Sequence, residues 1–355
     1  MIHHATMLPP GALPRRGRSL FAIATTLLLA PTLCAQLAVT QITTSNTNQS
    51  NQTVNGDTFN RLTTAITEFK DAAGNIYDAN TVASNAYIRR NTTAGNASNS
   101  SVWYDQGTST DFEAPYATSY GSLLLGNNIL RGSDNTFANG TGVSEGDIER
   151  LDFLFSATGI TTTITTAFAV FDRGLANQHD NVKIAVITGW DSVNQVPTAY
   201  GGVLVGLTPS DYGTSNVASD FTYSLFRYSN GNNLGSPYWD DNSETGTQGL
   251  GGATISMSDL GISAGTTIYG YSLMAGDVTN GGSMSNLVDW TDATYYSTST
   301  SGATGTGGID LSAVNGVLYN KRVPEPSTYG AIFVGLSAAL FGWRRHRRNL
   351  SAPEA

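Results

Sequence analysis

Short apolar and aromatic runs alternate with Gly, Asn, Asp and Ser breaks along most of the chain after residue 101. Many of these runs are rich in β-branched and aromatic residues, which favour strands, and turn-forming residues separate them. Two of the runs, 151–155 and 168–171, suit strands that are buried on one face or lie in a sandwich core. The pattern predicts strands at 122–125, 148–155, 161–171, 182–188, 200–207, 221–228, 267–273 and 317–319.

The stretch from 36 to 100 has fewer such runs. A strand is predicted at 37–42, followed by an Asn/Thr-rich loop to residue 60. Leu62, Ile66 and Phe69 recur at helical spacing, so residues 61–72 are the best helix candidate, with an edge strand as the alternative. One option is therefore a loop-rich N-terminal part at 36–100 followed by a sandwich at 101–322.

Eight or more predicted strands, little helix and 39 glycines among 355 residues indicate an all-β protein. The expected architecture for residues 36–322 is a β-sandwich or a jelly roll, with the Asn/Ser-rich loops at its ends. This length is sufficient for one large domain or two smaller ones with real cores.

The N-terminal segment has the layout of a secretory signal peptide. Arg15, Arg16 and Arg18 form the basic region, an apolar stretch follows at 20–30, and cleavage is expected between Ala35 and Gln36. The chain has a single cysteine, which lies before this cut. The mature protein would then contain no disulfide and no thiol for catalysis or metal binding.

The C-terminal segment carries no charge from residue 328 to residue 343. Sixteen residues of helix rise about 24 Å, which is short for a hydrocarbon core but usable with flanking residues. The sequence predicts a single transmembrane helix at about 328–343, with a buried core helix as the alternative. Its cytoplasmic end would be marked by four arginines, Arg344, Arg345, Arg347 and Arg348.

The residues Val323, Pro324, Glu325 and Pro326, the apolar helix and the arginine cluster follow one another in this order. Together, at 323–348, they resemble the PEP-CTERM sorting signal, a tail that has also been called the "ice-binding protein C-terminal domain". The resemblance implies an exosortase that recognises the Pro-Glu-Pro motif, cuts near it and delivers the protein to the cell surface or the extracellular polymer. It also implies export by the secretory translocase and a transient inner-membrane stage. The stretch 149–188 is more loosely similar to uncharacterised exported proteins with such a tail, and this similarity implies no activity.

Charge narrows the range of partners. Residues 36–322 contain 11 basic and 25 acidic residues, so nucleic acid and anionic lipid are poor candidates. Oxygen-rich clusters at 147–149, 179–181 and 240–244 leave a structural calcium ion open. None has the spacing of an EF-hand, and Asp and Asn are also ordinary turn residues. No other cofactor is indicated.

Candidate chemistry is sparse. His179 is the only histidine within 36–322, and no Gly-x-Ser-x-Gly elbow accompanies it. Glu149, Asp152 and the acids at 240–241 could supply the two carboxylates of a glycosidase. Thr161, Thr163 and Thr165 alternate along a predicted strand, but one row of three is too small for ice binding. Aromatic side chains near turns could stack on sugars: Trp103, Tyr104, Tyr116, Tyr120, Trp190, Tyr238, Trp239, Trp290, Tyr295 and Tyr296.

Two functions from different classes remain. The first is an exported bacterial surface or matrix protein with a structural or adhesive role, no catalytic activity and exopolysaccharide as a candidate partner. The alternative is a secreted carbohydrate-active enzyme that uses paired carboxylates.

Overall fold

The computed structural model describes residues 36–54, 57–91, 100–105, 120–139, 147–175, 178–213, 217–221, 223–228, 237–239, 248–300, 307–323 and 326–350. The predicted signal peptide at 1–35, including Ala35 at its cleavage site, lies outside these residues, as do Pro324 and Glu325. Strands make up 49% and helices 12% of the structure, which confirms the all-β class.

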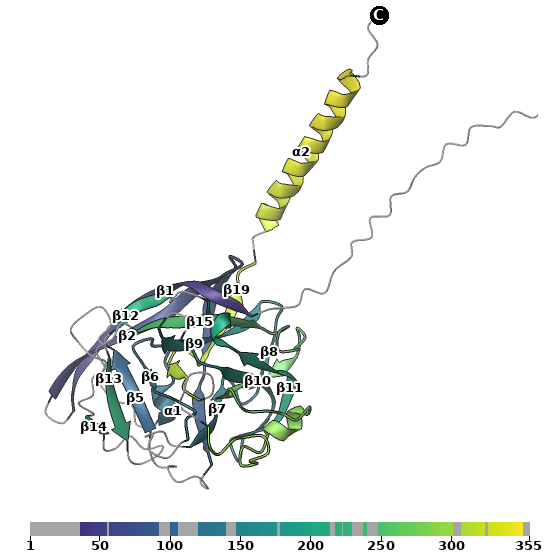
Figure 1. Ribbon diagram of the computed structural model, residues 1–355. Coiled ribbons are helices and arrows are strands. Elements are labelled where there is room, and N and C mark those ends of the chain that lie inside the picture. Colours follow the sequence, from purple (N-terminus) through teal and green to yellow (C-terminus); the bar gives the residue numbers. More distant parts are fainter. Residues whose placement is uncertain are drawn as a thin grey trace, which may run out of the picture. The chain divides into compact units, whose positions relative to one another are not determined.

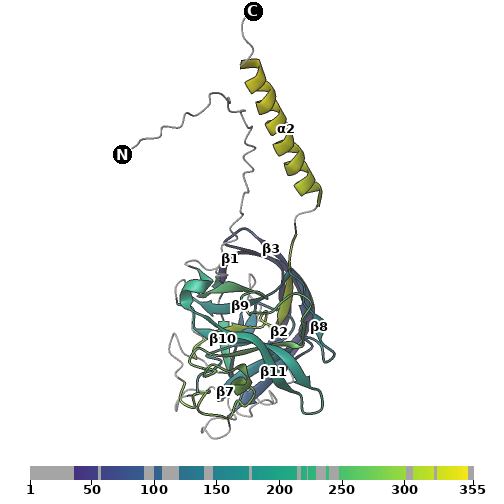
Figure 2. The same ribbon diagram turned by 90° about the vertical axis from the view of Figure 1, so that its right-hand side faces the viewer.

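Six antiparallel strands close into a barrel (Figures 1 and 2). Each strand pairs with the next, and the last pairs with the first. In ring order they are β15 (Gln248–Ser256), β1 (Leu37–Val54), β2 (Asp57–Asp71), β3 (Ile76–Val82), β19 (Val317–Lys321) and β9 (Thr166–Gly174).

The barrel sheet also extends beyond the ring. From β9 it continues through β18 (Asp310–Ser312), β6 (Arg131–Ser133), β5 (Ser100–Asp105), β13 (Tyr223–Tyr228) and β14 (Pro237–Trp239), while β12 (Ala218–Phe221) pairs with β15. A second, five-stranded sheet has the order β11 (Val196–Leu207), β10 (Val182–Asp191), β17 (Gly270–Ala275), β7 (Ile148–Leu154) and β4 (Asn85–Arg90). The remaining elements are the pair β8 (Ile160–Thr161) and β16 (Thr267–Ile268), the helices α1 (Tyr120–Leu123) and α2 (Pro326–Leu350), and the 3-10 helices η1 (Pro209–Tyr212) and η2 (Met284–Leu287).

Strand β9 is buried along its whole length because it separates two cores. Ala167, Ala169 and Phe171 point into the barrel, where they belong to one apolar cluster. Phe168 and Val170 point the other way, into the cluster shared with the five-stranded sheet. Alternation of side chains across a strand requires this division.

Aromatic rings fill the barrel interior. Phe69 stacks on Tyr77 with ring centroids 4.7 Å apart and meets Tyr319 edge-on at 4.8 Å. On the other side of β9, the ring of Phe168 lies 4.5 Å from that of Tyr271 on β17. The five-stranded sheet therefore packs against the barrel wall through large apolar side chains.

The architecture differs from a sandwich of two open sheets or a jelly roll. The sequence prediction missed the barrel because residues 36–100 were expected to be rich in loops. In the structure this stretch contains β1 to β4, of which β3 pairs with β19 and β4 pairs with β7. Residues 36–100 thus share both sheets with the later part of the chain.

The helix predicted at 61–72 is wrong, since these residues form most of strand β2. Thr43 and Thr44 pair with Glu68 and Ile66, so Thr67 is an extra residue at a β-bulge. The bulge shifts the buried side of β2 from Thr64 and Ile66 to Phe69 and Asp71. Buried residues on either side of it are therefore spaced as they would be on a helix.

Two smaller strand predictions also need correction. Residues 122–125 were expected to form a strand, but the chain there lies at the short helix α1. Thr163 and Thr165 lie in the connection between β8 and β9, so they form no row along a strand with Thr161. The other predicted runs all contain strands, with boundaries shifted by a few residues.

The C-terminal tail forms the predicted helix, which runs from Pro326 to Leu350. In the described part of the chain, no helix is both long enough and apolar enough to cross a membrane. The prediction of a transmembrane helix at about 328–343 is corrected accordingly. The uncharged run of α2, from Pro326 to Trp343, has 18 residues, but polar residues at its start and glycines at 330, 335 and 342 lower its hydropathy, and arginines follow at once.

Candidate functional site

The predicted sorting residues lie at the junction of the last strand and the tail helix. Strand β19 ends at Lys321, Val323 is exposed, and Pro326 is the first residue of α2. Proline fits this position because the first helical turn needs no intrahelical N–H donor. Gln36, on the far side of the predicted signal-peptide cut, directly precedes β1. The four tail arginines, Arg344, Arg345, Arg347 and Arg348, lie within α2, because the helix continues beyond Trp343.

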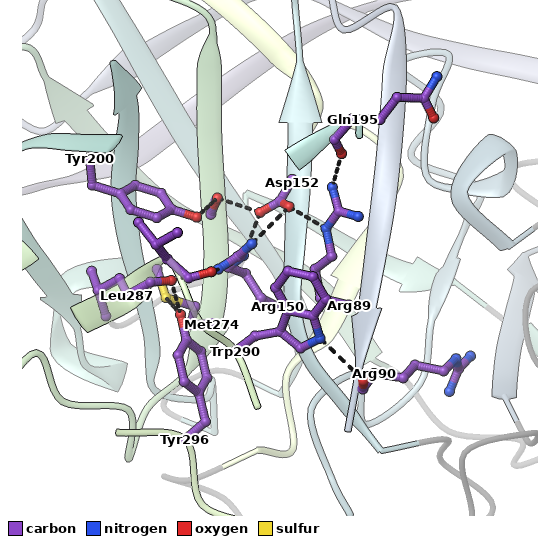
Figure 3. Close-up of polar contacts among 12 residues, drawn as sticks. Arg89, Arg90, Arg150, Asp152, Gln195, Tyr200, Met274, Leu287, Trp290 and Tyr296 are labelled. Atoms are coloured by element: carbon purple, nitrogen blue, oxygen red, sulfur yellow. Dashed lines mark hydrogen bonds and ion pairs between the residues drawn. The ribbon is translucent and has the colours of Figure 1, made fainter. Parts of the chain in front are cut away.

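Within the β domain, a polar cluster of several strands surrounds Asp152 of β7 (Figure 3). Arg150 reaches its carboxylate through Nε at 2.7 Å and Nη2 at 3.3 Å. Arg89 of β4 donates through Nε at 2.6 Å, and the hydroxyl of Ser272 on β17 donates at 2.6 Å. Both oxygens of Asp152 are thus hydrogen-bonded twice.

Sheet register explains why these side chains meet. Arg89 lies opposite Arg150 across the β4–β7 pair, and Ser272 lies opposite Asp152 across the β7–β17 pair. Directly paired residues in an antiparallel sheet point to the same face. Leu151 and Phe153 alternate with the charged residues and point to the apolar core. The five-stranded sheet therefore has one apolar face and one polar face.

The polar face is covered by residues 287–296. Arg150 donates through Nη1 to the carbonyl oxygens of Leu287, at 2.5 Å, and Val288, at 3.1 Å. The Tyr296 hydroxyl donates to the Leu287 carbonyl at 2.8 Å. Trp290 donates from its indole nitrogen to the Arg90 carbonyl at 3.2 Å. These bonds fix the covering segment to the sheet (Figure 3).

Aromatic rings surround the two guanidinium groups. The Arg150 carbon Cζ lies 5.0 Å from the Trp290 ring centroid and 5.6 Å from that of Tyr200. Arg89 is 5.2 Å from the rings of both Trp290 and Tyr87. Such contacts stabilise a cation that has lost its water shell.

The side chains of Arg150 and Asp152 are completely buried. Burial alone lowers the pKa of Arg150, but the adjacent Asp152 carboxylate raises it above its ordinary value, so the cation is retained. Burial also raises the pKa of the Tyr200 phenol, which is neutral and shares a 2.8 Å hydrogen bond with Ser272. The centre of the cluster is thus a buried charged pair, and only Arg89 at its edge is partly exposed.

Glu149 lies three residues before Asp152 in an opposite environment. It is 2% exposed and accepts a 3.2 Å hydrogen bond from Asn139. Burial raises the pKa of Glu149 to about 8, aided by the negative charges of Asp147 and Asp277, while the Asn139 bond opposes the shift. The carboxyl is therefore protonated at neutral pH. The two acids proposed as a glycosidase pair have separate sets of partners.

His179 is fully buried beside Asp172, with its Nδ1 3.4 Å from the Asp172 carboxylate. Its ring lies 5.0 Å from that of Tyr212 and covers Gly251, where a Cβ atom would overlap the imidazole. Asp172 also accepts backbone hydrogen bonds from Asp180, at 2.7 Å, and Asp310, at 2.9 Å. This histidine packs within the fold, and no serine accompanies it in these contacts.

The predicted metal clusters gain no support from the described side chains, since no three His, Cys, Asp or Glu residues among them lie close enough to hold a metal ion. Residues 240–244 lie outside the described part. Of the predicted aromatic surface, Trp103, Tyr120 and Tyr296 are core residues. Trp190, Trp290 and Tyr295 are partly buried. Tyr104 lies on β5, Tyr238 and Trp239 lie on β14, and Tyr116 lies outside the described residues.

Sequence reasoning named Asp152 and Trp290 but missed the network that joins them. Its members come from five separate stretches of the chain, and Arg89 and Asp152 are 63 residues apart. The alternation of charged and apolar residues at 150–153 was the one available signal, because it is typical of a strand between unlike environments.

Comparison with protein-family models, with curated proteins and with solved structures finds no match to this chain. The likeness of the tail to a sorting signal therefore depends on its own residues.

Proposed function

We propose that the chain is an exported surface or matrix protein with a structural or adhesive role, and that an exosortase processes it at Pro324, Glu325 and Pro326. The β domain is the functional product, and the tail is the substrate of the processing enzyme. The secretory translocase and the exosortase are the partners during export.

One observation carries the proposal. The motif falls between Lys321, the last residue of β19, and the body of α2. A cut there leaves every described strand in the N-terminal product, including β19, which pairs with β3 and β9. A cut a few residues earlier would fall within β19 and truncate a barrel strand.

The polar chemistry of the β domain supports a structural role. The Asp152 carboxylate has all its described hydrogen bonds inside a closed network, and Arg150 joins that network to the covering segment. Buried charges that are paired and hydrogen-bonded contribute to a rigid, unique structure when the network is complete.

The test is the intact mass and C-terminal peptide of the protein recovered from the medium and envelope of its native host. We expect a product that ends near 323–326 and lacks the arginine cluster. The double variant Pro324→Ala/Glu325→Ala should accumulate uncut, whereas Glu354→Ala, outside the motif, should be cut normally. Recovery of only the full-length native chain would overturn the proposal.

The alternative enzyme hypothesis has one specific observation in its favour. A carboxyl that is protonated at neutral pH, such as Glu149, has the property required of a general acid. The discriminating experiment incubates the protein with a panel of polysaccharides. Release of reducing ends that Glu149→Gln abolishes would favour the enzyme, and retention on a polysaccharide without turnover would favour the adhesive role.

A further inference from the structure

Strand β1 has a long polar segment with few neighbours. Beyond Ala38, its only described strand partner is β2, because the pairing of β1 with β15 covers just Leu37 and Ala38. Residues from Thr43 to Asn48 are all exposed. Within the described residues, the edge of β1 that faces away from β2 thus carries unpaired backbone donors and acceptors over this stretch.

The segment is also free of charge. Residues 37–56 contain no Asp, Glu, Lys or Arg, although charged residues make up 13% of the chain. On the neighbouring strand β2, the residues opposite Thr44 to Asn48 are uncharged as well, from Ile66 to Leu62. A two-stranded ribbon without charge is therefore present on a chain whose net charge is −9.

The other sheet edges carry features that discourage strand addition. Edge strand β4 ends in Arg89 and Arg90, β11 contains Pro197 and several register shifts, and β14 begins with Pro237. The four-residue strand β12 contains Asp220. Charges, prolines, bulges and short length are the usual protections of sheet edges. Residues 43–48 of β1 contain no charge and no proline, and their one protective feature is the bulge marked by the register shift between Thr43 and Thr44.

We propose that the edge of β1 from Thr43 to Asn48 pairs with the same edge of a second copy of the chain. The two strands run antiparallel about a twofold axis, so a residue on one side of the axis meets a residue on the other side, only the residues at the axis meet their own counterparts, and the interface is self-complementary. A second copy suits this edge because two acidic chains repel each other over most of their surfaces, and the uncharged ribbon adds no repulsion where they meet. The proposal does not depend on processing of the tail.

The first test adds charge to the edge. Ser45→Lys/Thr47→Lys places two lysines on exposed positions opposite Ala65 and Thr63, away from the buried side chains of Thr64 and Ile66. The control Ser192→Lys/Ala264→Lys adds the same charge to two exposed turns. Sedimentation equilibrium of the full-length chain, over about a hundredfold range of concentration, gives the dissociation constant of the dimer.

We expect the wild-type chain and the control to dimerise, and the edge variant to bind at least about tenfold more weakly. Equal thermal midpoints for the two lysine variants would show that both fold. A wild-type chain that is monomeric at every concentration would overturn the proposal. So would an edge variant that associates as tightly as the control, which would place the contact elsewhere, for example on the exposed apolar side chains of α2.

A second test locates the contact directly. In a Cys34→Ser background, single cysteines are introduced in turn from Thr43 to Asn48, and mild oxidation traps pairs whose Cα atoms lie within about 7 Å. Pairing about a twofold axis predicts disulfide-linked dimers with a maximum at one or two adjacent positions. Uniformly weak cross-linking, or equal cross-linking of the turn variant Ala264→Cys, would contradict the proposed pairing.

Discussion

Two acids on one strand, Asp152 and Glu149, have contrasting partners. Asp152 lies between Arg150 and Arg89 and keeps its hydrogen-bonding oxygens within a charged network. Glu149 has Asn139 as its neutral partner and the carboxylates of Asp147 and Asp277 as neighbours, and its pKa is raised to about 8. Both are buried, so the difference arises from their partners.

The comparison shows how one strand serves two environments. On the polar face of the five-stranded sheet, each buried charge is paired with an opposite charge. The apolar face instead presents uncharged side chains to the core, among them Leu151, Phe153 and Leu273. A charged network stabilises the fold only when it is complete, whereas apolar packing weakens gradually as contacts are removed. Substitutions on the two faces should therefore differ in kind as well as in size.

The largest effect is expected for Asp152→Ala. This change leaves Arg150 buried without its carboxylate, which should lower the free energy of unfolding by about 3–5 kcal/mol. The double variant Arg150→Met/Asp152→Leu, which removes the pair together, should lose much less. Urea unfolding of the single and double variants measures both values. Equal losses would mean that the ion pair has no special role in the polar face.

On the apolar face, Leu273→Ala should cost about 3 kcal/mol, through lost burial and the cavity that remains. The similarly sized change Leu273→Met should cost less than about 1.5 kcal/mol. On the polar face, by contrast, Asp152→Asn keeps the shape but removes the charge and should be as damaging as Asp152→Ala. If Asp152→Asn is as mild as Leu273→Met, the two faces do not differ as argued.

The pH dependence of stability should report the raised pKa of Glu149. The pKa of Glu149 is about 8 in the folded state, whereas its ordinary value, which applies to the unfolded chain, is 4.5. Between pH 4.5 and pH 8 the folded chain therefore holds one proton more than the unfolded chain. The free energy of unfolding should then fall as pH rises from 4.5 to 8, by up to about 1.4 kcal/mol per pH unit for this group.

Urea unfolding across this pH range should show a shallower decline for Glu149→Gln than for the native chain. Asp289→Asn is the control, because hydrogen bonds from Thr291 lower the pKa of Asp289. Its contribution is present at neutral pH and is lost only as pH falls into the acid range. An unchanged slope in Glu149→Gln would show that Glu149 is already ionised at neutral pH.

Parts of the fold were predictable from local pattern. The apolar run at 168–171 indicated a strand buried on one face or in a sandwich core, and the structure shows that β9 is buried on both faces because it lies between two cores. The β2 strand was misidentified because the bulge at Thr67 breaks the two-residue alternation, and 62, 66 and 69 then match helical spacing. Closure of the barrel was also not predictable, since it depends on β9 pairing with both β15 and β19 far along the chain.

The polar network was less accessible to sequence reasoning than the strands. Arg89, Asp152 and Ser272 meet only because three strands are paired in one register, and no local motif records that register. The Pro-Glu-Pro motif proposed for processing is the reverse case, because its residues are contiguous and their order alone suggested a role. A contiguous motif can be recognised from the sequence alone, whereas a network across strands can be recognised only when the pairing of the strands is known.

The smallest effect is expected for Arg89→Met. Arg89 lies on edge strand β4, its side chain is 11% exposed, and Asp152 retains Arg150 and Ser272 when it is removed. The methionine also keeps the apolar contact with Trp290. We expect a loss of about 1–2 kcal/mol in urea unfolding, well below that of Asp152→Ala. The exposed Arg322, which pairs with Glu68 and Asp78, provides the matched control, and Arg322→Met should change stability still less. If Arg89→Met proves as damaging as Asp152→Ala, the network depends on both arginines equally. The burial of a residue would then not determine how much its removal lowers the free energy of unfolding.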